Sequence, residues 1–190
     1  NSAFLGYWKL GFSVAAAIAL LLYLFNGNPN SATVSTIKSL LGSVKIIQQN
    51  GNELMNPKVG TSISIGSTIE TVSMGSFVEL EFPDQSIFTL SDLSQCVILR
   101  YDSNYRELRL LKGKFTSDIK TKTNKTPLKV YTPSFSLNVL EAKFDIDTME
   151  EFSYFRAGKG KVQLTRLSDS QSKEVSENQE IFFSDGQVSS

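Results

Sequence analysis

Hydrophobic and polar residues follow two different patterns along this chain, and the pattern changes near residue 30. Residues 4–25 are almost entirely apolar, and the polar sequence Asn26-Gly27-Asn28-Pro29-Asn30 ends that run. Beyond it, apolar and polar residues alternate over short stretches, as in Val78-Glu79-Leu80-Glu81-Phe82. Such alternation predicts strands with one face toward a core and the other toward water. We therefore expect one apolar helix followed by an all-β domain.

The apolar run has the length and the flanks of a transmembrane helix. At about 1.5 Å per residue it would cover roughly 33 Å, which matches a bilayer core. Aromatic rings and one lysine stand where a headgroup region would hold them, and no small-residue cleavage site follows. An anchor is therefore favoured over a cleaved signal peptide, the main alternative, and over a buried core helix. Lys9 favours a cytoplasmic N-terminus. The assigned anchor residues include Trp8, Lys9, Leu20, Leu21, Leu22 and Tyr23.

The predicted organisation has three parts. Residues 1–30 form the anchor (helix about 4–25) and a polar turn, residues 31–42 a linker rich in small polar residues, and residues 43–190 the domain. We expect the domain to be twisted, mainly antiparallel, and solenoid-like or sandwich-like. Asn50-Gly51 is the strongest hairpin signal. Other turns are expected at Pro83-Asp84, Gly113, Gly158-Lys159-Gly160 and Asp185-Gly186.

Composition removes several classes of function. The chain has no histidine, so the common general base and the commonest zinc ligand are missing, and we expect no enzyme, no cofactor and no metal site. The formal net charge is zero, which gives a nucleic-acid partner no electrostatic support. The only cysteine, Cys96, lies in an apolar, strand-like run. It is expected to be a small buried residue.

One charge pattern suggests a binding surface. Residues 112–129 contain six lysines and a single acid, Asp118. A solvated edge that keeps a strand soluble explains this pattern, and so does a site for an acidic partner or an anionic envelope polymer. The candidate partner-binding residues are Lys114, Lys120, Lys122 and Lys125.

The order of several short motifs resembles the FecR-type extracytoplasmic domain. The motifs are Gly42–Ile46, Ile65–Thr71, Gly75–Ser86, Leu108–Phe115, Val130–Pro133 and Gly160–Val162. Two departures stand out. Gln85 replaces the glycine usual in the family's Asp-Gly-Ser turn, and residues 140–144 read Leu-Glu-Ala-Lys-Phe where Arg-Gly-Thr-x-Phe is common. The second departure would remove a tight backbone feature.

This resemblance implies where the protein works and how. In the FecR family, such a domain follows one inner-membrane helix, lies in the periplasm and relays an outer-membrane receptor's state to a cytoplasmic sigma factor. We accordingly expect a single-pass protein of the bacterial inner membrane whose C-terminal domain contacts one or more envelope proteins in signal relay. The alternative is a structural or scaffold subunit of an envelope assembly. Whether the chain forms a homo-oligomer or a larger assembly stays open.

Overall fold

The computed structural model describes residues 32–120, 126–148, 152–184 and 187–189, and these residues are all-β. The predicted membrane helix, with all its anchor residues, lies outside them. No helix in the described part is long and apolar enough to cross a membrane. The fifteen strands are β1 (Thr33–Leu41), β2 (Val44–Ile47), β3 (Glu53–Met55), β4 (Ser62–Ser64), β5 (Thr68–Thr71), β6 (Phe77–Glu81), β7 (Ile87–Tyr101), β8 (Arg106–Asp118), β9 (Leu128–Tyr131), β10 (Phe135–Val139), β11 (Ala142–Thr148), β12 (Phe152–Arg166), β13 (Ser172–Ser176), β14 (Glu180–Ser184) and β15 (Gln187–Ser189).

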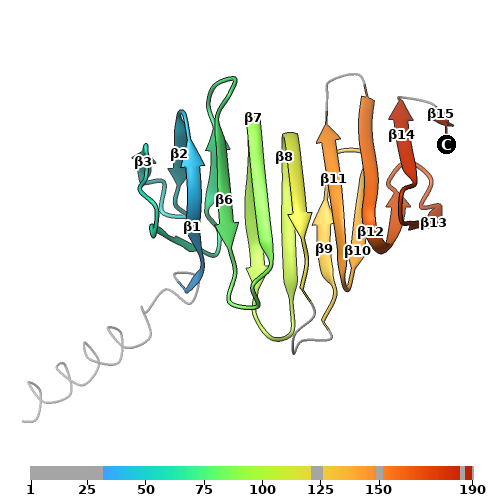
Figure 1. Ribbon diagram of the computed structural model, residues 1–190, viewed down its shortest axis with the longest axis horizontal. Coiled ribbons are helices and arrows are strands. Elements are labelled where there is room, and N and C mark those ends of the chain that lie inside the picture. The colour runs from blue at the N-terminus through green and yellow to red at the C-terminus, as the bar shows by residue number, and fades with distance from the viewer. Residues whose placement is uncertain (1–31, 121–125, 149–151, 185–186, 190) are drawn as a thin grey trace, which may run out of the picture. The chain divides into compact units, whose positions relative to one another are not determined.

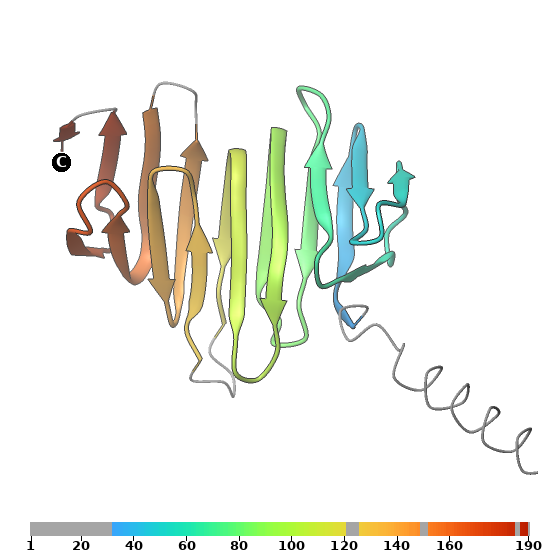
Figure 2. The ribbon, with the colours of Figure 1, turned by 180° about the vertical axis from the view of Figure 1, so that it is seen from behind.

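The strands form one hydrogen-bonded sheet that is folded into two layers (Figures 1 and 2). Three long strands belong to both layers. The first half of β7 pairs with β6 and its second half with β5, the two halves of β8 pair with β9 and β11, and those of β12 with β11 and β10. Layer one therefore runs β4-β1-β6-β7-β8-β11-β12-β14-β15, and layer two runs β3-β2-β5-β7-β8-β9-β10-β12-β13.

Each long strand changes layer at a crease where the backbone is left-handed. In β7, Asp92 and Leu93 have φ values of 48° and 55°, which is uncommon for residues other than glycine. In β8, Gly113 has φ 89° and faces Ser94, whose side-chain oxygen accepts the Lys114 N–H at 2.7 Å. In β12 the crease lies at Gly160, with φ 81°. The β7 and β8 creases adjoin each other, and the hydrogen bond between Lys114 and Ser94 joins them.

A row of aromatic rings fills the space between the layers. Phe82 lies 4.6 Å from Phe88, and the contacts continue through Phe115, Phe144 and Phe155 at 5.5 to 6.1 Å between ring centroids. Phe135 and Phe183 complete the row, stacked at 4.6 Å. Offset and tilted ring pairs at these separations add to the stabilisation by area burial. The core is thus continuous along the row of strands.

The alternation read from the sequence is confirmed. Val78, Leu80 and Phe82 are buried, whereas Glu79 and Glu81 between them are not. The Asn50-Gly51 hairpin joins β2 to β3, and Cys96 is buried, which raises the pKa of its thiol to about 12. The strands are mainly antiparallel, as expected, and the β8–β9 pair is parallel.

Two expectations need correction. Residues 31–42 are not a linker, because Thr33–Leu41 form β1, which pairs with β4 and β6 inside layer one. Gly113 and Gly158-Lys159-Gly160 do not separate strands, because they are the creases of β8 and β12. The expected turn at Asp185-Gly186 lies outside the described residues.

The crease contact gives a first prediction. A Cβ atom at Gly113 would lie 2.3 Å from Ser94 Oγ and 2.5 Å from Ser94 Cα, so Gly113→Ala should force the two creases apart. We expect it to lower the free energy of unfolding by about 3 kcal/mol or more, as measured by chemical denaturation. Gly51→Ala is the matched control, because Gly51 has φ 84° but no atom near the added Cβ. It should lose only the left-handed strain of about 1–2 kcal/mol. Equal losses would show that the crease contact is unimportant.

Candidate functional site

The turn between β6 and β7 holds the motif residues Asp84 and Ser86. The Ser86 N–H donates to Asp84 Oδ1 at 2.9 Å, and the Phe82 N–H donates to the Ser86 carbonyl at 3.0 Å. Between them, Gln85 has φ 66°, a conformation that glycine adopts without strain. The departure from glycine at this position therefore leaves the turn geometry in place. The turn directs the second Asp84 oxygen into the domain.

That oxygen meets a buried arginine. Arg106, at the start of β8, is 1% exposed, and its Nη2 lies 3.0 Å from Asp84 Oδ2. The Tyr101 hydroxyl donates to the same oxygen at 2.9 Å, and the Arg106 guanidinium lies 5.5 Å from the Tyr101 ring centre. Burial raises the pKa of Tyr101, although the positive charge of Arg106 opposes that shift. The phenol therefore stays protonated and remains a donor to Asp84.

The arginine cluster, meaning Asp84, Ser86, Tyr101 and Arg106, joins three connections at one end of the domain. Ser86 Oγ accepts the Lys120 N–H at 3.1 Å and an Arg106 N–H at 3.3 Å. Arg106 Nη1 donates to the Thr126 carbonyl at 3.2 Å. The β6–β7 turn, the start of β8 and both described ends of the β8–β9 connection are therefore held by one buried charge. Thr36 of β1 pairs with Glu81, the last residue of β6, so residue 32 lies at this same end of the domain.

A cavity of about 300 Å³ lies beside this cluster, where β8 ends and the β12 crease passes the β10–β11 turn. Ile119 and Ala142 form its buried apolar floor. Asp118 contacts the amino groups of Lys120 and Lys143 at 3.1 and 3.0 Å. Burial alone would raise the pKa of Asp118, but hydrogen bonds from the two lysines outweigh it and lower the pKa below its usual value.

The second motif departure, at residues 140–144, lies at this cavity, because Glu141, Ala142 and Lys143 line it. A Cβ atom at Gly160 would lie 2.5 Å from the Glu141 carbonyl oxygen. A close backbone approach is therefore present here, and the glycine that permits it is on β12.

The candidate lysines do not lie together on one hairpin. Lys114 is at the β8 crease, 3.9 Å from Asp92, and Lys120 follows the other end of the same half-strand, about 20 Å away at 3.3 Å per residue. β8 ends in layer one and β9 begins in layer two, parallel to the first half of β8, so the two strands do not form a hairpin. Lys122 and Lys125 lie outside the described residues. The cavity instead brings Lys120 near Lys143 and Lys159, two lysines that are distant in the sequence.

Two crystal structures share this fold. Both are of a candidate anti-sigma factor from Parabacteroides distasonis, at 1.65 and 2.50 Å resolution. Each is 17% identical to this chain with a TM-score of 0.56, and the match covers 64% of this chain and 57% of the other. The chain thus spans little more than half the length of these relatives. No curated protein matches the sequence.

The family follows from the sequence match. The model of the FecR protein family matches residues 67–163, just over half of the chain. This chain therefore belongs to the FecR family. The match includes the β6–β7 turn, Arg106 and both creases that adjoin Ser94.

Sequence reasoning found Asp84 and Ser86 as motif residues but missed Arg106 and Tyr101. A signal for Arg106 was present, because it shares the two-residue phase of Leu108 and Leu110, which are buried. A charged residue on the apolar face of a strand requires a partner, and Asp84 is that partner. Nothing comparable marks Tyr101.

The cluster gives a second prediction. Asp84→Asn should leave the Arg106 charge buried without a counter-charge and lower the free energy of unfolding by about 3–5 kcal/mol. The double variant Asp84→Asn, Arg106→Met removes both charges, so it should be less destabilised than the sum of the single variants, as tested by denaturation of all three. Asp169→Asn is the control, because Asp169 forms an exposed pair with Arg166. It should melt close to the wild type. Additive losses in the double variant would contradict the buried-pair interpretation.

Proposed function

We propose that this protein is a single-pass protein of the bacterial inner membrane whose FecR domain faces the periplasm and relays a signal by protein contact, without catalysis. Membership of the FecR family is the observation that carries the proposal. The shared fold with a candidate anti-sigma factor supports a regulatory role in the same direction. The membrane span is proposed from residues 4–25 of the sequence.

The structure suggests how such a domain could report contact with a partner. The arginine cluster fixes the connection after β8 to the end of the domain where residue 32 enters. A partner that displaces this connection would disturb the pairing of a buried charge, and such a change costs several kcal/mol. We propose that the β8–β9 connection and the lysines beside its start, Lys120, Lys143 and Lys159, form the contact surface. An acidic segment of the partner would bind there.

Topology can be tested directly. A periplasm-dependent reporter fused after Ser190 should be active, the same reporter fused before Asn1 should be silent, and the intact chain should stay in the membrane pellet after carbonate extraction. Release of a shortened soluble form would show that residues 4–25 belong to a cleaved signal.

Relay can be separated from scaffolding with a charge-matched pair of variants. The first replaces Lys120, Lys122, Lys125 and Lys143 with Gln, and the control replaces Lys38, Lys58, Lys161 and Lys173 with Gln. Both should melt close to the wild type, because the exposed ion pairs of lysine contribute little to stability. In a low-salt pull-down from envelope extracts, the first variant alone should lose partners. In cells, it alone should change a set of transcripts several-fold.

The outcomes discriminate between the two functions. Lost partners with an unchanged transcript profile would favour the scaffold role. Unchanged partners and transcripts would contradict the lysine contact and return the segment to a solvated edge.

A further inference from the structure

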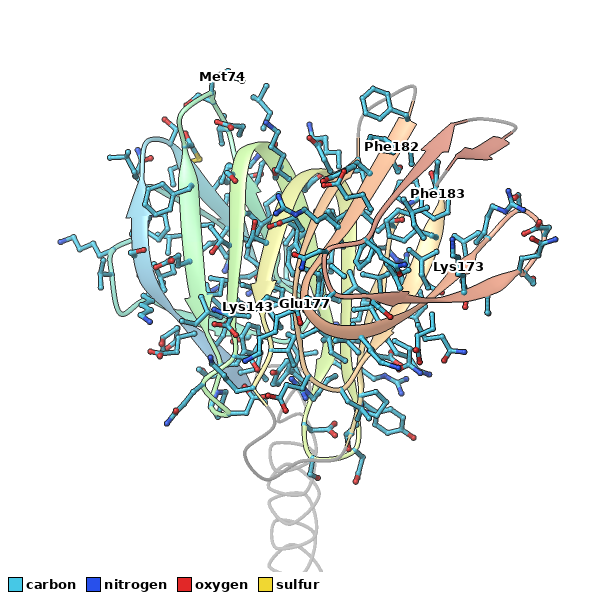
Figure 3. All side chains as sticks on the ribbon, turned by 45° about the vertical axis from the view of Figure 1, so that its right-hand side comes forward. Met74, Lys143, Lys173, Glu177, Phe182 and Phe183 are labelled. Carbon is cyan, nitrogen blue, oxygen red and sulfur yellow. The ribbon has the colours of Figure 1, made fainter. Side chains whose placement is uncertain are left out.

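A strip of exposed aromatic side chains lies on the outer face of layer one, far from the arginine cluster. Phe152 and Tyr154 stand two residues apart on β12, about 7 Å along the strand, and therefore point to the same side. On the neighbouring strand β14, Phe182 pairs with Tyr154, and the two ring centres are 5.0 Å apart. Phe152 is 39% exposed and Phe182 43% exposed. Figure 3 shows Phe182 beside the buried Phe183 on β14.

Polar groups flank the strip in register. Asp147 of β11 pairs with Tyr154 on the side away from Phe182, so its carboxylate lies on the same face. Arg156 and Glu180, the next pair of residues on that face, form an exposed ion pair at 3.8 Å. The Asp147 carboxylate accepts no hydrogen bond from any described residue, and partial burial raises its pKa against the opposing charge of Lys114. The face therefore combines ring surfaces with one acceptor that has no described hydrogen bond, Asp147, and with an exposed ion pair.

We infer that this strip is a binding site for an uncharged, pyranose-based oligosaccharide. One face of a pyranose ring carries C–H groups that are polarised by the neighbouring oxygens, and these fit the negative face of an aromatic ring. The sugar's equatorial hydroxyls then reach sideways to carboxylate and guanidinium groups, the groups that flank Tyr154 and Phe182 here. Three acids and two bases surround the strip when Lys114 and Asp145 are included, so an anionic ligand is disfavoured.

The position of the rings on an open strand face favours a sugar over a protein. Aromatic anchors of protein interfaces are enriched in packed pockets that a rim of other residues shields from water. Here the rings lie on the outer face of a sheet, with hydrogen-bonding groups along one side. The family match ends at residue 163, so it includes Phe152 and Tyr154 but not Phe182. The strip is independent of the proposed lysine contact, which uses other residues.

The test uses the full chain in a detergent without a sugar headgroup, so that the detergent cannot compete. The probes are chitohexaose and cellohexaose, with N-acetylglucosamine and glucose as the monomeric forms, and the readout is saturation-transfer-difference NMR of the sugar protons. We expect transfer to the C–H protons of at least one hexasaccharide, and much weaker transfer to its monomer. That difference would identify an extended glycan strand, as opposed to a free sugar, as the ligand.

Variants locate the site. Phe182→Ala should weaken binding of the hexasaccharide at least tenfold, whereas Tyr154→Phe, which keeps the ring, should weaken it less. Leu167→Ala is the matched control, since Leu167 is an exposed apolar residue on the segment after β12. It should bind like the wild type, and circular dichroism should show that all three variants are folded. Absence of transfer to both hexasaccharides in the wild type, or equal binding by Phe182→Ala, would overturn the inference and leave protein contact as the use of the strip.

Discussion

The fold depends on strands that bend across two layers without losing their hydrogen-bonded neighbours. In this domain the strands bend where the backbone turns left-handed, at Asp92-Leu93, Gly113 and Gly160. At the first two sites the strands are in close contact, because Ser94 packs against the Cα of Gly113. Ser94 Oγ accepts a hydrogen bond from the Lys114 N–H, and the Ser94 N–H donates to Thr71 Oγ1. Two non-glycine residues in that conformation carry strain. The aromatic core between the layers compensates for it, since the creases are what place the two halves of each long strand on opposite sides of that core.

The arginine cluster has a different role from the creases. Hydrophobic packing defines the layers, but it does not specify how the connections at their ends are arranged. A buried guanidinium with directional donors does, because Asp84, Ser86 and the Thr126 carbonyl must all be in place to satisfy it. Its Nε has no hydrogen-bond partner among the described residues, so the pairing is not complete. The desolvation of two buried charges offsets much of their attraction, so the pair adds little net stability even though removing one partner is costly.

The strands could be predicted from the sequence, whereas the creases and the cluster could not be read directly. Alternation is a local signal, so Val78 to Phe82 and the other alternating segments were identified correctly. The sequence predicts turns at the glycine creases of β8 and β12, because glycine is typical of both features. A distinguishing signal existed: the buried residues of β8 have even numbers up to Leu110 and odd numbers from Phe115 onward, and in β12 the phase also changes, between Ala157 and Val162. β7 keeps its phase across Asp92, so its crease leaves no such trace. Pairing of Arg106 with Asp84 depends on tertiary structure, which a single sequence does not reveal.

The layer order also determines how the domain responds to tension. The described chain begins just before β1, and β15 is the last strand of layer one, so the two ends of the domain lie toward opposite ends of the row of strands (Figure 1). A pull between them acts across the strands, along their hydrogen bonds, and opens one pair at a time instead of shearing many together. β15 would detach first, and β14 would follow only when Ile181 and Phe183 leave the core. The resistance rises at β12, because that strand belongs to both layers and both must open before it is released.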